Sequence, residues 1–277
     1  MLAYVRNGTT FTDVPVNQPL LSKSLVGCKL VGLSEGCFAA YTVTLEARKL
    51  WIFKYSETLS KFEITYSQDI AGSISVMRYH EGTARLLVGG SSPEVAIHDF
   101  NPTTGSLSDL GVSLSPSRAQ PMYSAAWFPD GSGFYASDYH SANRWTLVYY
   151  TLNGTTLTQT VVPVADAGST VIQPTDFAVS DSGEYIARGS SGQPGAANGT
   201  FDIIRVDGST FSEILTTRLG AGAYGTSVLV QPSGEYAYVY TSGSQRWRLF
   251  KQDSPETYSE VSVAASVRFT AVAIGRD

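Results

Sequence analysis

The side chains that most often carry out chemistry are scarce in this sequence. Its three histidines are His80, His98 and His140. His80 precedes a Glu-Gly turn and is expected to be exposed, whereas His98 neighbours Asp99 on a predicted strand, where successive side chains point to opposite faces. His140 stands in a predicted connecting loop in which Asp138 could share its side. These patterns favour ordinary polar residues over a catalytic or metal-binding group.

The two cysteines and the Asp-containing turns do not indicate a metal site either. Cys28 and Cys37 are predicted to lie on paired strands of one hairpin, about 13 Å apart at ~3.3 Å per residue, which is too far for a disulfide. No Cys-X-X-Cys or Cys-His spacing supports zinc. The segments that begin at Asp130 and Asp181 resemble pieces of calcium loops but lack the alternating oxygen ligands and the distal Glu. We therefore expect no catalytic residue, no cofactor and no metal.

Aromatic and polar residues in predicted loops are the remaining candidates for function. Tyrosine is large, amphipathic and low in conformational entropy, so it is a good contact residue at a binding surface. The Gly-rich residues 189–199 are expected to form a surface loop between two strands. The candidate residues for contact with a protein or a glycan are Tyr123, Tyr139, His140, Gln193, Asn198 and Tyr224.

A repeat that runs along the chain determines how these residues would be positioned. A hairpin turn flanked by strand patterns recurs with glycines at positions 36, 82, 131, 183 and 234, a period of about 50 residues. A second hairpin follows each first one, and its Asn153-Gly154 and Asp207-Gly208 dipeptides are typical of type I′ turns. Tryptophans 51, 145 and 247 recur near the predicted start of the third strand. Each repeat therefore predicts four antiparallel strands.

Repeats of this length and strand content resemble WD40-like and lactonase-like β-propellers. The Trp-Asp and Gly-His pairs of WD40 blades are absent, so the resemblance implies an architecture and no functional residues. We expect an all-β chain, residues 1–277, that forms a single six-bladed β-propeller domain. Residues 268–277 match an inner strand and Met1 begins at a third strand, so the N- and C-terminal strands are expected to close the ring in a shared blade. A β-sandwich or a β-helix is the alternative.

Charge and hydropathy exclude several kinds of partner. The formal net charge of −5 gives no Lys/Arg stripe for a phosphate backbone, so no nucleic-acid partner is expected. No run of 18 apolar residues predicts a transmembrane helix, and the N-terminus lacks a secretory signal pattern, so no membrane insertion is expected.

These observations favour a non-enzymatic scaffold that contacts other protein subunits of a large assembly. A compact, weakly charged, Thr-, Gly- and Ser-rich all-β protein without a signal is typical of virion parts, so we expect a structural or decoration protein of a tailed phage, located in the virion. A cytoplasmic adaptor, a glycan- or host-surface-binding propeller and a lactonase-type or glycan-processing enzyme are the alternatives. The enzyme would need several carboxylates on inner strands, and the predicted inner strands 124–128 and 227–230 carry almost none.

Overall fold

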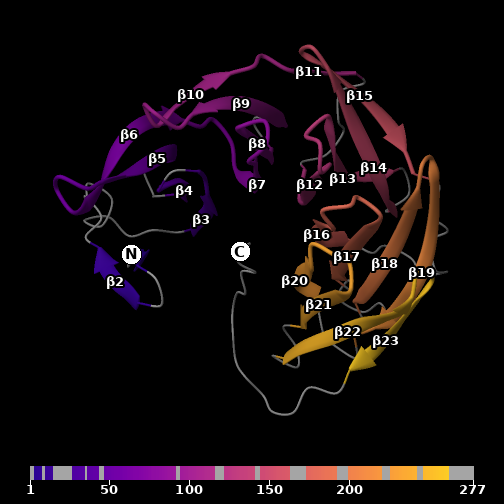
Figure 1. Cartoon of the computed structure of the whole chain (residues 1–277). Coiled ribbons are helices and arrows are strands. Elements are labelled where there is room, and N and C mark those ends of the chain that lie inside the picture. The colour runs from indigo at the N-terminus through magenta and orange to yellow at the C-terminus, as the bar shows by residue number, and fades with distance from the viewer. Residues whose placement is uncertain are drawn as a thin grey trace. The chain divides into compact units, whose positions relative to one another are not determined.

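The computed structural model is built from strands. It describes residues 3–7, 10–14, 27–34, 36–43, 47–91, 94–115, 122–140, 144–162, 173–191, 199–219, 225–241 and 246–261, and none of these residues is helical. The chain divides into two compact units, Met1–Val112 and Ser113–Asp277, and each is described by itself (Figure 1). The prediction of an all-β chain is confirmed for the described residues.

Unit 1 contains a hairpin and two four-stranded sheets. The hairpin, sheet A, pairs β1 (Ala3–Asn7) with β2 (Thr10–Val14). The strands of sheet B are β3 (Gly27–Gly32), β4 (Cys37–Val43), β5 (Arg48–Ser56) and β6 (Lys61–Asp69). The strands of sheet C are β7 (Ile74–His80), β8 (Arg85–Gly90), β9 (Val95–Asn101) and β10 (Ser106–Asp109). In both sheets each strand pairs antiparallel with the next along the chain.

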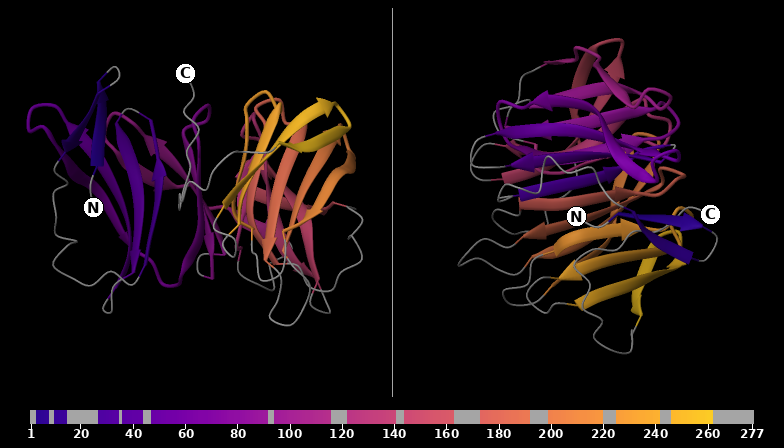
Figure 2. Two further views of the ribbon diagram at one scale, coloured as in Figure 1. Left: turned by 90° about the horizontal axis from the view of Figure 1, so that it is seen from below. Right: turned by 90° about the vertical axis from the view of Figure 1, so that its left-hand side faces the viewer.

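Unit 2 repeats this plan in three sheets. The strands of sheet D are β11 (Ser113–Ser115), β12 (Ala125–Trp127), β13 (Gly133–His140), β14 (Arg144–Asn153) and β15 (Thr156–Val161). The strands of sheet E are β16 (Gln173–Val179), β17 (Tyr185–Ser191), β18 (Thr200–Asp207) and β19 (Thr210–Arg218). The strands of sheet F are β20 (Gly225–Val230), β21 (Tyr236–Thr241), β22 (Arg246–Ser254) and β23 (Thr257–Val261). The strands twist strongly within each sheet (Figure 2).

One strand of sheet D was predicted differently. Residues 113–115 lie beyond the four antiparallel strands that each repeat predicts, and they form β11, which pairs in parallel with β15 and places Ser113 opposite Thr156. The outer edge of β15 has unpaired backbone groups, and an extended segment beside it satisfies them at little cost. Sheet D therefore has five strands, whereas sheets B, C, E and F have four.

The hairpin turns are only partly those predicted. Asn153 pairs with Thr156 and Asp207 pairs with Thr210, so the central turn residues begin at Gly154 and Gly208. In each of these two turns the glycine has positive φ (+61° and +59°) and the second central residue does not. This is the pattern of a type II′ turn and not of the predicted type I′. A glycine in the first central position is what type II′ requires.

The first hairpin of sheet B differs from its predicted register by one residue. Cys28 lies opposite Thr42 and Gly32 opposite Phe38, because residues 33–37 form a longer turn than the predicted two-residue one. Cys37 is buried, as expected, and the side chain of Cys28 lies outside the described residues.

Each four-stranded sheet has two unlike ends. The first-to-second and third-to-fourth turns are at one end, which we call the turn end, and the second-to-third connection and the links between sheets are at the other, which we call the loop end. In unit 2 sheets E and F run in the same direction. The Asp181 amide donates to the Pro232 carbonyl (3.0 Å) at the turn end, and the Val228 amide donates to Asp176 Oδ2 (3.1 Å) nearer the loop end.

Apolar layers between neighbouring sheets form the core of each unit. Layer B–C in unit 1 includes Leu50, Ile52 and Leu86. In unit 2, layer E–F includes Phe201 and Phe250, whose rings stack with centroids 4.9 Å apart. Layer D–E is a third such cluster, described below. Sheet E lies between layers D–E and E–F, so both of its faces are covered, which explains why β17 and β18 are buried over most of their length.

Candidate functional site

The structure places three of the six predicted contact residues on or beside strands. Tyr123 is half-buried and comes just before β12. Tyr139 and His140 were predicted to lie in a loop. The structure places them in β13, where they pair with Trp145 and Arg144. The polar composition of this stretch suggested a loop, but ladder pairing with the long strand β14 overrides that local preference. The side chains of Tyr139 and His140 are outside the described part of the structure.

The other three predicted contact residues, Gln193, Asn198 and Tyr224, lie outside the described residues. The predicted loop 189–199 is wrong at its start, because β17 continues to Ser191 and both Gly189 and Ser190 are buried. Tyr123 and His140 lie at the loop end of sheet D, and the described residues Ser191, Gly199 and Gly225, which flank the other three, lie at the loop ends of sheets E and F. Sequence reasoning thus selected one end of unit 2.

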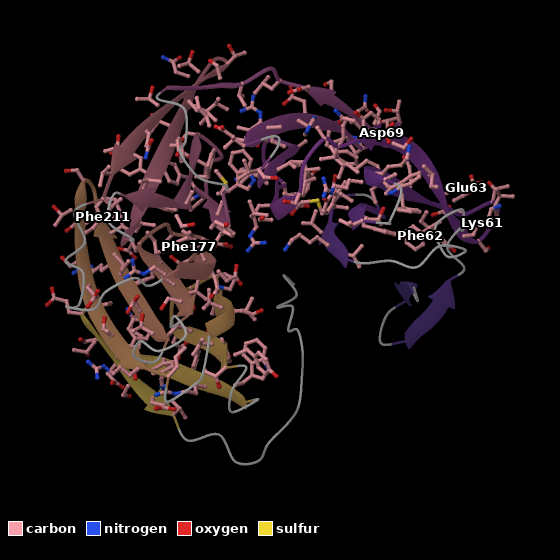
Figure 3. All side chains as sticks on the ribbon, turned by 180° about the vertical axis from the view of Figure 1, so that it is seen from behind. Lys61, Phe62, Glu63, Asp69, Phe177 and Phe211 are labelled. Carbon is pink, nitrogen blue, oxygen red and sulfur yellow. The ribbon has the colours of Figure 1, made fainter. Side chains whose placement is uncertain are left out.

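Layer D–E connects this end to the core. Its apolar part includes Tyr135 and Leu147 of sheet D with Phe177 and Ile186 of sheet E. Figure 3 labels Phe177 on the inner strand β16 and Phe211, from the outer strand β19, which packs against the same cluster. The layer therefore spans sheet E from its first strand to its last.

Towards the loop end, layer D–E becomes polar. Side chains two residues apart on a strand share a face. Arg188 and Ser190 therefore share the face of Ile186, and Asp202 shares that of Ile204, both of which pack against sheet D. By the same alternation, Ser137 follows Tyr135 on the facing surface of sheet D. We call the buried polar residues on these two surfaces the D–E polar cluster. Its members are Ser124, Ser137, Arg188, Ser190, Thr200 and Asp202.

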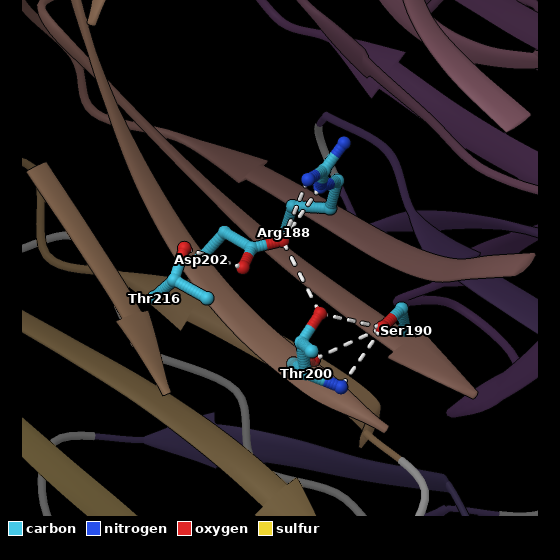
Figure 4. A network of polar contacts seen from close by, with 5 residues as sticks. All are labelled: Arg188, Ser190, Thr200, Asp202 and Thr216. Carbon is cyan, nitrogen blue, oxygen red and sulfur yellow. Dashed lines mark hydrogen bonds and ion pairs between the residues drawn. The ribbon is translucent and has the colours of Figure 1, made fainter. Parts of the chain in front are cut away.

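The centre of the D–E polar cluster is an ion pair between the second and third strands of sheet E. Arg188 and Asp202 are directly opposite each other in the ladder. Arg188 Nε donates to Asp202 Oδ2 at 2.8 Å, and Nη2 lies 2.7 Å from the same oxygen (Figure 4). Their side chains are only 8% and 2% exposed. A charge so deeply buried requires a partner, and each of these groups supplies the other with one.

Hydroxyl groups complete the hydrogen bonding of Asp202. Thr216 Oγ1 donates to Asp202 Oδ1 (3.1 Å), and Thr200 Oγ1 donates to Oδ2 (3.4 Å). Ser190 Oγ lies 2.8 Å from Thr200 Oγ1 and accepts the Thr200 amide hydrogen at 2.9 Å. These bonds join the ends of β17 and β18 that bound residues 192–198 (Figure 4). The carboxylate is thus held from three strands, and it holds Arg188 in one orientation.

Two donors of the cluster remain available. The hydrogen bonds of Arg188 use Nε and Nη2, and no acceptor among the described residues binds Nη1. Part of the guanidinium is turned away from the carboxylate in Figure 4. Ser124 Oγ is buried and has no hydrogen-bond partner in the described part of the chain. A buried donor without a partner is uncommon and costly in folded proteins, so Ser124 Oγ suggests a ligand that supplies an acceptor.

Tyr135 borders the cluster and stays protonated. Burial raises its pKa to about 12, and the neighbouring Tyr149 adds to the shift. Its phenol is therefore neutral at physiological pH. The arginine and the aspartate are the only charged members of the D–E polar cluster.

One inner-strand carboxylate escaped the sequence analysis. Asp176 on β16 is the only carboxylate on the five strands β3, β7, β12, β16 and β20. Its oxygens accept the amide hydrogens of Phe177 (3.0 Å) and Val228 (3.1 Å), and the ladder is irregular just before it, between Pro174 and Asp176. Asp176 lies on the face towards sheet F, opposite to that of Arg188. It holds sheets E and F together and is not a member of the cluster.

The D–E polar cluster itself was missed because its members are separated in the sequence and mixed with apolar residues. The available signal was Arg188 and Asp202, two charges that follow the strand alternation of the apolar residues Ile186 and Ile204. A charge at a buried strand position indicates a partner on the neighbouring strand. Such a pair cannot be found without the register.

Metal and membrane features were also sought among the described residues. Within those ranges, no group of three or more His, Cys, Asp and Glu side chains is placed to hold a metal ion. The same ranges contain no helix long and apolar enough to cross a membrane.

Known proteins match this chain through structure only. No protein-family model and no curated protein sequence matches it. Among solved structures, a "putative 6-phosphogluconolactonase" from Bacteroides uniformis is 14% identical, with a TM-score of 0.60, over 84% of this chain and 70% of that one. A protein of the same description from Bacteroides fragilis is 11% identical, with a TM-score of 0.57, over 84% and 79% of the two chains. The Swd1 β-propeller domain of Myceliophteria thermophila is 12% identical, with a TM-score of 0.57, over 94% and 73%.

At these identities the likeness shows the fold alone. The repeated antiparallel sheets are those of a β-propeller-type fold, as the resemblance in the sequence implied.

The prediction of a phage virion protein is wrong. The similar structures include the two Bacteroides proteins described as lactonases, which fit the lactonase-type alternative better than a structural role in a virion. The virion prediction depended on a composition rich in Thr, Gly and Ser. Any propeller built of short strands and tight turns has this composition, so it does not distinguish a virion part from an enzyme.

Proposed function

We propose that this chain is a lactonase-type propeller enzyme that hydrolyses a sugar-derived lactone at the loop end of sheets D and E. The observation that carries the proposal is Arg188, a buried arginine that Asp202 holds in one orientation while its Nη1 group has no acceptor among the described residues. Support also comes from the fold shared with the two Bacteroides proteins described as lactonases. The earlier prediction that the chain is not an enzyme stays untested, and the assay below decides between the two.

The reaction needs what Arg188 offers. Water adds to the lactone carbonyl carbon, the ring C–O bond breaks, the ring oxygen takes a proton and the product is a hydroxy acid that ionises at neutral pH. Negative charge develops on the carbonyl oxygen during the addition, and a fixed donor in a site with little water stabilises it strongly. In this proposal Arg188 is the catalytic donor, and Asp202 is a positioning residue because it acts through Arg188.

The test is proton release from glucono-δ-lactone at constant pH, measured with the full chain and corrected for spontaneous hydrolysis. Arg188→Met is expected to lower kcat/KM by about a hundredfold to a thousandfold, the usual cost of one lost oxyanion donor. Thermal unfolding of each variant, recorded in parallel, separates lost catalysis from lost folding.

Arg85 provides the matched control. It also forms an ion pair with a directly opposed aspartate, Asp99, but lies in sheet C with a 28% exposed side chain. Arg85→Met is expected to leave kcat/KM unchanged. If the wild-type rate equals the spontaneous rate and the chain binds the lactone saturably, the proposal of an enzyme is wrong and a glycan-binding module takes its place.

The number of propeller sheets and the closure of the ring are also proposals. We propose six sheets in a ring, in which sheet A and residues 268–277 form the sixth sheet. The support is the inner-strand pattern of residues 268–277 and the existing pairing of β1 with β2, which places Ala3 opposite Val14. Removal of residues 268–277 is expected to lower the thermal midpoint of both units together, because a closed ring loses a shared sheet. An unchanged midpoint would contradict closure.

A further inference from the structure

We propose that the substrate of this site is an uncharged lactone, and that the D–E polar cluster selects against a phosphorylated one. This inference rests on the proposed lactonase function and specifies its substrate class. The observation behind it is the charge balance of the cluster, in which the carboxylate of Asp202 offsets the cationic side chain of Arg188 at 2.7 Å.

Recognition of a phosphoryl group normally uses uncompensated positive charge. Arginine binds phosphate best through two parallel hydrogen bonds from the same guanidinium. In this site Nε and Nη2 are already engaged with Asp202, so this paired edge is occupied. Nη1 and the second hydrogen of Nη2 remain, but Asp202 already offsets the positive charge of the guanidinium, so these donors suit a neutral acceptor such as a carbonyl or hydroxyl oxygen better than a dianion.

The other available donor of the cluster is uncharged. Ser124 Oγ is buried without a partner among the described residues, whereas the hydroxyl groups of Ser190 and Thr200 already form hydrogen bonds within the cluster. Hydroxyl groups exchange hydrogen bonds readily with the hydroxyl groups of a sugar, since each can both donate and accept. Such a lining compensates poorly for the desolvation of a dianion.

One other cation shares this face of sheet E. Arg218, at the end of β19, lies opposite Thr200 in the ladder and is exposed. An exposed charge interacts weakly with a ligand because water and salt screen it. The net charge of −5 on the whole chain further disfavours a dianion. Arg218 therefore does not reverse the preference set by the buried pair.

The test compares kcat/KM for glucono-δ-lactone with that for 6-phosphoglucono-δ-lactone under the same conditions. We expect the uncharged lactone to be preferred by at least about tenfold, equivalent to about 1.4 kcal/mol. Inorganic phosphate at millimolar concentration is expected to inhibit neither reaction.

Two variants examine the cause of the preference. Asp202→Asn keeps the shape of the side chain but leaves the charge of Arg188 uncompensated, so the preference is expected to move towards the phosphorylated lactone by about tenfold. The ratio of the two rates is the readout, because loss of folded protein affects both rates equally. Arg218→Gln is expected to leave the ratio unchanged.

The outcomes separate the two proposals. Hydrolysis of neither lactone would overturn the proposed function. Equal rates, a preference for the phosphorylated lactone or a ratio that depends on Arg218 would overturn the inference about charge while leaving the lactonase function in place. An unchanged ratio in Asp202→Asn would show that the buried pair does not set the preference.

Discussion

Sheets C and E each contain an Arg–Asp pair built in the same way, and the two pairs differ in their surroundings. In both, the arginine stands on the second strand and the aspartate directly opposite it on the third. Arg85 Nε lies 3.1 Å from Asp99 Oδ1, and Arg188 Nε lies 2.8 Å from Asp202 Oδ2. The side chains of the sheet C pair are 28% and 48% exposed, whereas those of the sheet E pair are 8% and 2% exposed.

The position of such a pair in the sheet, and not the pairing itself, decides what the pair contributes to stability and function. Arg85 begins β8 at the turn end, where solvent reaches both charges. Arg188 lies near the loop end inside layer D–E, where Asp202 needs Thr200 and Thr216 as additional donors. A solvated pair adds little to stability, whereas a buried pair is expensive to form and more expensive to break. The buried pair is therefore the one with a reason to exist beyond stability.

The largest expected effect is that of breaking the buried pair. Asp202→Ala leaves a buried guanidinium without its counter-ion and is expected to lower the free energy of unfolding by about 3–5 kcal/mol. Urea unfolding measures the difference, with Asp99→Ala as the matched variant in sheet C. A loss below about 1 kcal/mol for Asp202→Ala would show that the two pairs are equivalent.

A double variant removes the ambiguity of the single one. The double variant Arg188→Met/Asp202→Leu removes both buried charges and fills their volume with apolar side chains. It is expected to restore most of the unfolding free energy that Asp202→Ala loses. Activity is expected to stay lost, because the donor to the substrate is gone. Recovery of activity with stability would contradict the catalytic role of Arg188.

The next expected effect depends on pH and concerns sheet C. His98 on β9 is buried, and its Nδ1 atom has no hydrogen-bond partner among the described residues. Burial lowers the pKa of His98 below 6.5, and the nearby Asp109 and Asp99 oppose the shift. The folded protein then binds fewer protons than the unfolded chain at mildly acidic pH, so stability is complete above pH 6.5 and falls as the pH drops below it.

His98→Leu tests this dependence. The substitution keeps an apolar side chain in layer B–C and removes the titrating group, so the stability of unit 1 is expected to change less between about pH 7 and about pH 5 than in the wild type. Urea midpoints over this range measure it. A wild-type slope that persists in the variant would assign the pH dependence to other groups.

The sequence predicts the repeated sheets well because their signals are local. The glycines of the first hairpins at positions 36, 131, 183 and 234 have the positive φ that the turns require. In sheet C the pattern fails: Ala84, and not Gly82, has positive φ (52°), because the turn between the paired residues His80 and Arg85 is shorter than the first turns of the other sheets. A single-residue change in turn length is invisible in a repeat of this size.

The candidate site could not be predicted in the same way. Its polar members lie on three strands, apart from Ser124 just before β12, and only the register brings Arg188 opposite Asp202 and Asp202 opposite Thr216. Tyr123 and His140 were chosen from composition, and they share with the cluster only the loop end of the sheets. Local signals thus identified the end of the sheet but not the residues, since partnership across strands is a tertiary property.

A smaller effect is expected from the hydrogen bonds around Asp202. Thr216→Val removes the donor to Oδ1 from the outer strand while retaining a β-branched side chain, and is expected to cost about 0.5–1.5 kcal/mol of unfolding free energy. Because Arg188 keeps its carboxylate partner, kcat/KM is expected to fall much less than in Arg188→Met. A catalytic loss as large as that of Arg188→Met would mean that Thr216 itself contacts the substrate.

The smallest expected effect is that of the exposed pair in sheet C. Arg85→Met and Asp99→Asn are each expected to change the free energy of unfolding by less than about 1 kcal/mol, because solvent already stabilises both charges. Raising the salt concentration from about 0.05 M to about 0.5 M should remove what difference there is, since the screening length falls below the spacing of most surface charges. The pair in sheet E, which solvent barely reaches, should keep its full effect over the same range. Equal salt sensitivity of the two pairs would mean that layer D–E admits water and ions at the loop end, and the argument that Arg188 acts in a dry site would then fail.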